Sequence, residues 1–263
     1  MTMFEIIDQW TKIIPGFMLI FSRLSAIVIS LPIISYPIIS QKIRTLLAFV
    51  LTMILFPMVD FSTLELDTLS GLGLALGREI MIGLFIGFGA RIIFESFTMA
   101  GSFVGRQIGI GIANVMDPTS RQQIPVISQF WALLMVTYFL VADGHYLLIS
   151  TLFKNFTIIP LAGGVFTPAL GERIIVSGSR AFMLALKLAL PAMAFLLLVD
   201  TAIAFIARVM PQMNIFWVSL PLKIGTGIIV LIISVDIFQL LFDVVYGDIA
   251  TYIQAIMSEL KGA

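Results

Sequence analysis

Residues 72–100 read LGLALGREIMIGLFIGFGARIIFESFTMA, an apolar stretch interrupted by the charges of Arg78, Glu79, Arg91 and Glu95. About 20 apolar residues suffice to cross the hydrocarbon core of a membrane as a helix. On an insertion scale a central Arg, Lys or Asp costs about 2.5–3.5 kcal/mol, while each Leu or Ile returns about 0.3–0.6 kcal/mol. These charges together cost on the order of 10 kcal/mol, which roughly cancels the apolar gain of the segment. We therefore expect a helix that does not face lipid alone.

The composition of the whole chain indicates the same class of protein. The chain has 263 residues, of which 60% are hydrophobic and 11% are charged, and its formal net charge is zero. Soluble domains are usually about 45–50% apolar and about 25% charged, so a water-soluble globule is excluded. A zero net charge gives no sign of the excess of basic residues that nucleic-acid-binding proteins use.

The sequence offers little for catalysis or for a cofactor. It contains no cysteine, which excludes thiolate nucleophiles and sulfur-ligated metals. Its single histidine, His145, lies in Asp143-Gly144-His145, which we interpret as a turn between two apolar runs. No constellation of His, Ser, Asp or metal ligands typical of an intramembrane enzyme is visible. We expect no enzyme activity, no catalytic or metal-binding residue and no cofactor.

Apolar stretches of spanning length recur along the chain with short hydrophilic breaks between them. They predict a single all-α unit, a membrane-associated bundle of helices without strands. Pro191, Pro211 and Pro221 lie inside these stretches, and we expect them to kink or break helices. The acidic N-terminal residues lack the basic region of a leader peptide, so we expect the N-terminus to be retained. The expected helices cover residues 13–35, 43–59, 72–100, 124–142, 174–200, 213–235 and 236–257.

The charges inside the apolar stretches allow two interpretations. They cap helix ends or snorkel to the membrane interface, or they face protein or a water-filled cavity. Arg91 and Glu95 are spaced to pair on one helix face. The last stretch favours the second interpretation, because Asp236, Gln239 and Asp243 follow one another at helical spacing on one face. The predicted buried or lumen-facing charges are Arg78, Glu79, Arg91, Glu95, Asp236 and Asp243.

Glycine is concentrated in one part of the chain, since ten of the 20 glycines lie between positions 71 and 111. Several form G-x-x-x-G steps, a spacing that lets helix backbones approach closely in an apolar medium. The close approach serves either packing between subunits or packing within the chain. The candidates for subunit packing are Gly83, Gly87, Gly101 and Gly105.

The sequence changes character at residues 105–123, GRQIGIGIANVMDPTSRQQ. Gly109 and Gly111 each weaken a helix by about 1 kcal/mol relative to alanine, and Asp117-Pro118 favours a turn. Non-helical backbone at membrane depth is tolerated only where protein or a cavity surrounds it. The segment is either a poorly formed helix end buried in the bundle or a deformable plug of a pore, a role that suits the adaptable side chain of Met116.

Three separated blocks of sequence are more specific than any single G-x-x-x-G step. They are GSFVGRQIGIGIANVMDPTSRQQIPVISQF at 101–130, DGHYLLISTL at 143–152 and RVMPQMNIFWVSLPLKIGTG at 208–227. These blocks resemble the FliR family, a flagellar export-gate subunit with a counterpart in type III secretion injectisomes. The resemblance covers nearly the whole chain in order and length.

The resemblance implies a non-enzymatic core component of a protein export gate. Such a subunit assembles with FliP and FliQ chains, next to FlhB and above FlhA, in the bacterial inner membrane at the flagellar basal body, where unfolded flagellar proteins pass. Within one export-gate domain, residues 1–174 would be FliP-like and residues 175–263 would form a FliQ-like helical hairpin. The bend of that hairpin would lie at Pro211, Gln212, Pro221 and Lys223.

The family's central plug is a loop of this subunit, and by motif it falls on the segment that begins at Ile108. The plug is aliphatic here, whereas the bulkiest plug side chains of the family are often aromatic, and Arg106 stands where a neutral residue is expected. The boundary residues are Arg106, Asp117 and Pro118, and the plug comprises Ile108, Gly109, Ile110, Gly111, Ile112, Ala113, Asn114, Val115 and Met116.

A stand-alone secondary transporter is the alternative function. It would use intramembrane charges as an ion or substrate site, and the candidates are Arg78, Glu79, Asp200 and Lys223. Such a transporter predicts inverted internal repeats, and the sequence has no convincing self-similarity.

Overall fold

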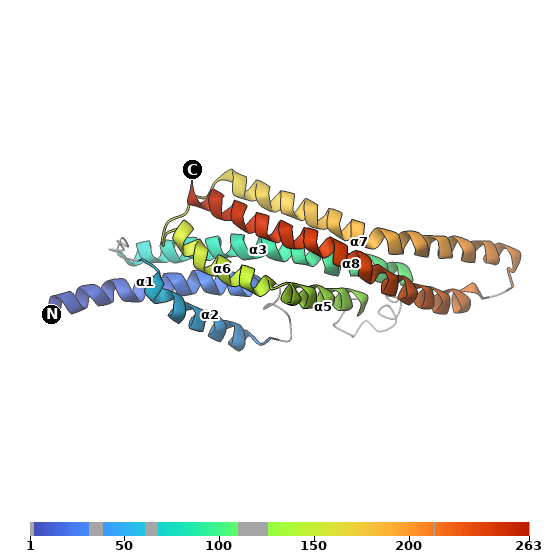
Figure 1. The fold of residues 1–263 in the computed structure, drawn as a ribbon, viewed down its shortest axis with the longest axis horizontal. Helices are drawn as coiled ribbons and strands as arrows, with labels where there is room; N and C mark the ends of the chain where they lie inside the picture. Colours follow the sequence, from blue (N-terminus) through green and yellow to red (C-terminus); the bar gives the residue numbers. More distant parts are fainter. Residues whose placement is uncertain (1–2, 32–38, 61–67, 110–125, 213, 263) are drawn as a thin grey trace. The chain divides into compact units, whose positions relative to one another are not determined.

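The computed structural model describes residues 3–31, 39–60, 68–109, 126–212 and 214–262. Every regular element within these ranges is helical, so the prediction of an all-α fold is confirmed. The elements are α1 (Met3–Ser30), α2 (Gln41–Leu55), the short 3₁₀ helix η1 (Phe56–Met58), α3 (Leu69–Ile108), α5 (Val126–Val141), α6 (Gly144–Ile158), α7 (Pro168–Val209) and α8 (Ile215–Lys261) (Figure 1).

The length and composition of the helices fit a membrane-associated bundle. Within the described ranges, five helices are long and apolar enough to cross a membrane, and a sixth span is added if α5 and α6 are counted as one bent span. Asp143 separates them with a φ of 57°, a left-handed conformation that Asp adopts more readily than most residues. The turn expected at Asp143-Gly144-His145 thus leads directly into a helix.

The last two expected helices are one helix in the structure. α8 runs without a break over 47 residues. It contains all of the expected helix 236–257 and, from Ile215 on, the expected helix 213–235. The charge of Asp236 does not end the helix, because that residue is exposed on this chain. Pro221 lies inside α8 and Pro191 inside α7. Each removes one backbone N–H from its helix, and neither ends the helix.

The chain forms two compact units, each built from separate segments of the sequence. The first unit comprises Met1–Ile93, Asp143–Gly178 and Asp248–Ala263, and the second comprises Phe94–Ala142 and Ser179–Gly247. α3, α7 and α8 each contribute residues to both units. The expected division of the chain after residue 174 follows sequence resemblance and stays a prediction.

In the first unit, α3 lies against α1 at two glycines. A Cβ atom at Gly83 would lie 2.6 Å from the carbonyl oxygen of Arg23, and one at Gly87 would lie 2.5 Å from the Cβ of Ser30. Such a close approach leaves no room for a side chain. The structure therefore uses this G-x-x-x-G step for packing within the chain, which was one of the two alternatives.

In the second unit, α3 approaches α5 in the same way. A Cβ atom at Gly101 would lie 2.6 Å from the Cα of Ser128, and the hydroxyls of Ser102 and Ser128 are hydrogen-bonded at 2.9 Å. Gly105, one helical turn further along, is buried. The core of this unit is aromatic, with the ring of Phe238 in contact with those of Phe97, Tyr138 and Trp131.

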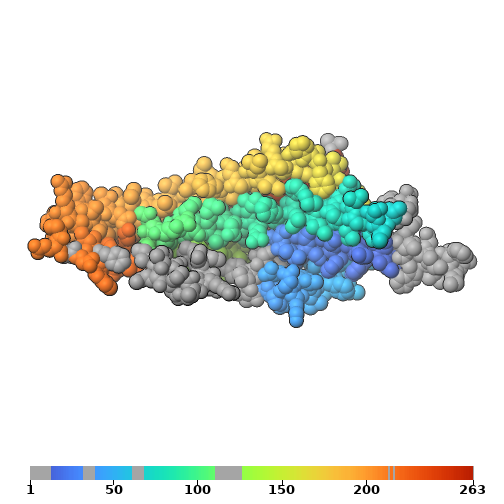
Figure 2. All heavy atoms as spheres, turned by 180° about the vertical axis from the view of Figure 1, so that it is seen from behind, coloured from blue at the N-terminus to red at the C-terminus, as the bar shows by residue number. Residues whose placement is uncertain are grey.

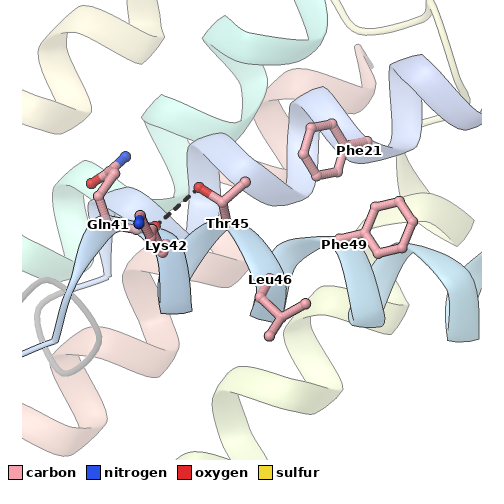
Figure 3. A pocket seen from close by; sticks show the side chains of 6 residues that line it. All are labelled: Phe21, Gln41, Lys42, Thr45, Leu46 and Phe49. Atoms are coloured by element: carbon pink, nitrogen blue, oxygen red, sulfur yellow. Dashed lines mark hydrogen bonds between the residues drawn. The ribbon is translucent and has the colours of Figure 1, made fainter.

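The surface of α2 is strongly apolar. This helix lies beside α1, and side chains from several of its turns stand on the surface (Figure 2). Its exposed apolar residues are Ile43, Leu46, Leu47, Phe49, Val50, Met53 and Ile54. A shallow groove of about 470 Å³ between α1 and α2 is lined by Phe21, Gln41, Lys42, Thr45, Leu46 and Phe49 (Figure 3). An apolar surface of this kind suits lipid or a neighbouring subunit.

Candidate functional site

The predicted plug begins where α3 ends, and this end is well defined. Ile108 is the last residue of α3, and its side chain is fully buried. Gly109 follows with a φ of 89°, which favours glycine, and its N–H donates to the carbonyl oxygen of Arg106 at 3.1 Å. A glycine in this conformation commonly terminates a helix. Plug residues 110–116 and the boundary residues Asp117 and Pro118 lie outside the described residues.

A polar bridge joins the last turn of α3 to α7 and α8 in the second unit. The side-chain amide of Gln107 on α3 donates to Oδ2 of Asp200 on α7 at 3.0 Å. Oδ1 of the same carboxylate pairs with the ammonium group of Lys223 on α8. The side chains of Asp200 and Lys223 are 28% and 24% exposed. We call these three residues the α3 bridge.

An apolar contact lies next to the α3 bridge. A Cβ atom at Gly227 on α8 would lie 2.4 Å from Cδ1 of Ile108. Only glycine leaves room for the Ile108 side chain at this distance. Neither Gln107 nor Gly227 is among the site residues predicted from the sequence. Both lie inside the blocks that carry the family resemblance, which is the signal that could have found them.

A buried charge cluster organises the first unit around Arg23 of α1, which is fully buried. Its guanidinium pairs with the buried carboxylate of Glu79 on α3 through Nε and, at 3.0 Å, through Nη2. Nη1 donates to the side chain of Asn155 at 3.1 Å and to the carbonyl oxygen of Ile159 at 2.8 Å. Nη2 also donates to the carbonyl oxygen of Pro160 at 3.1 Å. All five guanidinium N–H groups are therefore satisfied by protein.

The partner carboxylate is equally well supported. Oε1 of Glu79 accepts a second hydrogen bond, from the backbone N–H of Ala162 at 2.7 Å. The ring of Phe156 covers the guanidinium carbon of Arg23 at 4.7 Å, a favourable cation–π arrangement. Arg78, next to Glu79 on α3, is exposed and donates to the carbonyl oxygen of Ala162 at 2.9 Å. We call Arg23, Glu79 and Asn155 the Arg23 clamp.

The other predicted charges lie on the surface of this chain. Glu79 is the one predicted charge that is buried, whereas Arg78, Arg91, Glu95, Asp236 and Asp243 are exposed. Arg23 is not among the predicted charges, although its guanidinium donates five hydrogen bonds within the first unit. The position of Arg23 in the sequence does not indicate its partner, because Glu79 lies 56 positions away.

The predicted hairpin bend is split in the structure. Pro211 and Gln212 lie in the short connection between α7 and α8. Pro221 and Lys223 lie inside α8, and Lys223 takes part in the α3 bridge. In the second unit, this ion pair joins α7 to α8 and ties the two helices that flank the connection.

The polar residues of both units are arranged for holding helices together. Across the described parts of the chain, no three His, Cys, Asp or Glu side chains are grouped so that they could hold a metal ion. The carboxylates of Glu79 and Asp200 each accept hydrogen bonds or an ion pair on both oxygens. These two carboxylates hold neighbouring helices together.

Long apolar helices with an internally paired buried arginine and glutamate define a membrane-associated helical protein. The chain belongs to the family described as bacterial export proteins, family 1, which matches residues 14–248. It is 33% identical over 229 residues to the flagellar biosynthetic protein FliR of Bacillus subtilis, covering 85% of this chain and 87% of that protein. The FliR protein of Escherichia coli is 27% identical over 253 residues, covering 96% of this chain and 97% of that protein. The resemblance to the FliR family is confirmed.

Proposed function

We propose that this chain is a non-enzymatic core subunit of the flagellar type III protein export gate. The observation that carries the proposal is the similarity to FliR proteins. The match to the Bacillus subtilis relative covers 85% of this chain, and the match to the Escherichia coli relative covers 96%. Helices whose polar side chains bond one another, together with an extensive apolar surface, suit a subunit that packs into a larger membrane assembly.

In this proposal the chain acts with other subunits. It forms a pore for unfolded flagellar proteins together with FliP-like and FliQ-like chains, next to FlhB and FlhA. Its location is the bacterial inner membrane, at the flagellar basal body. The part before residue 175 corresponds to the FliP-like portion, and the part from residue 175 on corresponds to the FliQ-like hairpin.

The proposed plug of the pore comprises residues 108–116. Two described features support this assignment. Ile108 is held in the packed end of α3, and Gly109 turns the chain out of the helix. The sequence after Gly109 is apolar and contains a further glycine, which gives the backbone the conformational freedom that a deformable plug uses.

Deletion of residues 110–113 tests the plug. This deletion leaves Gln107, Ile108 and Gly109 in place, so the described end of α3 keeps its contacts. We expect increased ion conductance across membranes that contain the assembled complex, and altered export of flagellar proteins. Co-purification with FliP-like and FliQ-like chains serves as the control for assembly. An assembled complex with unchanged conductance and unchanged export would show that the plug assignment is wrong.

Purification of the unaltered chain tests the proposed partners. The export-gate subunit is expected to co-purify with FliP-like and FliQ-like chains when all are expressed together. Recovery of a stable monomer or homo-oligomer that leaves these chains behind would instead support the transporter alternative.

A further inference from the structure

We propose that the α3 bridge anchors the end of α3 to the α7–α8 hairpin, with Asp200 as the positioning residue. Asp200 uses one carboxylate oxygen for each neighbouring helix, Oδ2 for Gln107 on α3 and Oδ1 for Lys223 on α8. A single side chain on α7 therefore fixes three helices of the second unit to one another.

The polar contacts of the bridge fix the position of α3 along the hairpin in a way that apolar packing does not. A hydrogen bond requires a donor within about 3 Å of its acceptor and a favourable angle. Ile108 against Gly227 is a dispersion contact, which tolerates a small sliding movement better than a hydrogen bond does. The amide of Gln107 at 3.0 Å from Asp200 thus sets the register in which Ile108 lies on Gly227.

The surroundings make this bridge difficult to open. Leu196 precedes Asp200 by one turn of α7 and is fully buried, and both side chains of the ion pair are more than two-thirds buried. An ion pair in such a setting is weakly screened, so separating the charges costs more than it does on an open surface. The carboxylate also keeps the amide of Gln107 oriented, because a hydrogen bond to a charged acceptor is stronger than one to a neutral acceptor.

The functional part of the inference rests on the plug assignment proposed above. The plug begins at Ile108, the residue directly after Gln107. A shift of α7 relative to α8 would stretch or break the bridge and release the end of α3. The hairpin would then control the position of Ile108, from which the plug starts.

Cysteine alkylation tests the anchor directly, because the unaltered chain has no cysteine. Ile108 is fully buried, so I108C in the assembled gate should react slowly with N-ethylmaleimide. Adding Q107L or D200N should raise its rate of alkylation about tenfold or more, equivalent to about 1.4 kcal/mol. The charge-swapped D200K/K223D should restore slow alkylation, because the ion pair returns and the amide oxygen of Gln107 can accept from a lysine. Q239L, at an exposed glutamine of α8, is the matched control and should change nothing.

A second cysteine separates release of α3 from general loosening. Ser128 on α5 is also fully buried in the second unit, so S128C should stay equally unreactive in the Q107L and D200N variants. If I108C remained protected in both variants, or if S128C became reactive to the same extent, the anchoring role would be refuted.

Ion conductance of the same assembled complexes separates this inference from the proposed function. Fast alkylation of I108C together with increased conductance in D200N supports both. Fast alkylation with unchanged conductance supports the anchor and contradicts the plug assignment. Unchanged alkylation refutes the anchor, whatever the conductance.

Discussion

Replacing Arg23 by methionine is expected to destabilise the first unit severely. Methionine preserves much of the length of the side chain and removes the charge and all five donors. The carboxylate of Glu79 stays buried and loses its cation, and the side-chain oxygen of Asn155 and the carbonyls of Ile159 and Pro160 lose the hydrogen bonds that Arg23 donates. Removing one partner of a buried ion pair typically costs about 3–5 kcal/mol. That corresponds to a hundredfold to few-thousandfold change, roughly, in the folding equilibrium.

The matched control is Arg78→Met. Arg78 precedes Glu79 on the same helix, yet it is exposed, and its hydrogen bond is to the carbonyl oxygen of Ala162 at 2.9 Å. We expect little loss, because water can replace that hydrogen bond and no buried charge is left behind. Arg23→Lys keeps the charge but cannot reproduce the planar fork, so its stability should lie between those of the unaltered protein and the methionine variant.

Denaturation of the purified complex in detergent, followed by far-ultraviolet circular dichroism, measures these effects. The order of unfolding midpoints should be unaltered protein, R78M, R23K and R23M, from highest to lowest. Glu79→Gln should also fall well below R78M, because it leaves Arg23 without its counter-charge. Equal midpoints for R23M and R78M would refute the reasoning, since they would mean that the Arg23 clamp contributes no more than an exposed hydrogen bond.

Two further predictions concern the packing of α3. Gly89→Ala should lower the unfolding midpoint, because the new Cβ would lie 1.8 Å from Cζ of Tyr252 and displace a ring whose hydroxyl donates to a backbone carbonyl of α3. Gly77→Ala meets no atom within 4 Å and should raise the midpoint, because alanine is more favourable than glycine in a helix by up to about 1 kcal/mol. Equal effects of the two changes would contradict the packing. In the second unit, S102C combined with S128C should form a disulfide on mild oxidation, because the native hydroxyls are 2.9 Å apart. The expected readout is loss of maleimide labelling when the oxidised chain is denatured before the reagent is added, and persistent labelling of both cysteines would contradict the contact between α3 and α5.

The amino-acid sequence by itself determined the class of the protein and much of its secondary structure. Its apolar fraction and long apolar stretches predicted a helical, membrane-associated chain, and the helices confirm it. The glycines at 83 and 87 predicted a close approach of helices, because only a missing side chain permits it. The sequence left open whether that approach was to another subunit or to the same chain, and the contact with α1 decided this.

The continuity of α8 was decided by tertiary structure. Asp236 looks like a break when hydropathy is averaged along the chain, because a charge is costly if it must be buried. The residue is exposed, so the helix continues through it. Exposure depends on what packs against a helix, which local sequence does not specify.

The pairing of charges was the other property that only the tertiary structure decided. Helical spacing relates residues three or four positions apart, and it directed attention to Arg91 and Glu95, both of which are exposed. The buried pair joins Arg23 to Glu79 across 56 positions, and Asn155 joins the clamp from 132 positions away. Gln107 likewise reaches Asp200 across 93 positions. The sequence supplies these groups, but only the folded backbone brings them within hydrogen-bonding distance.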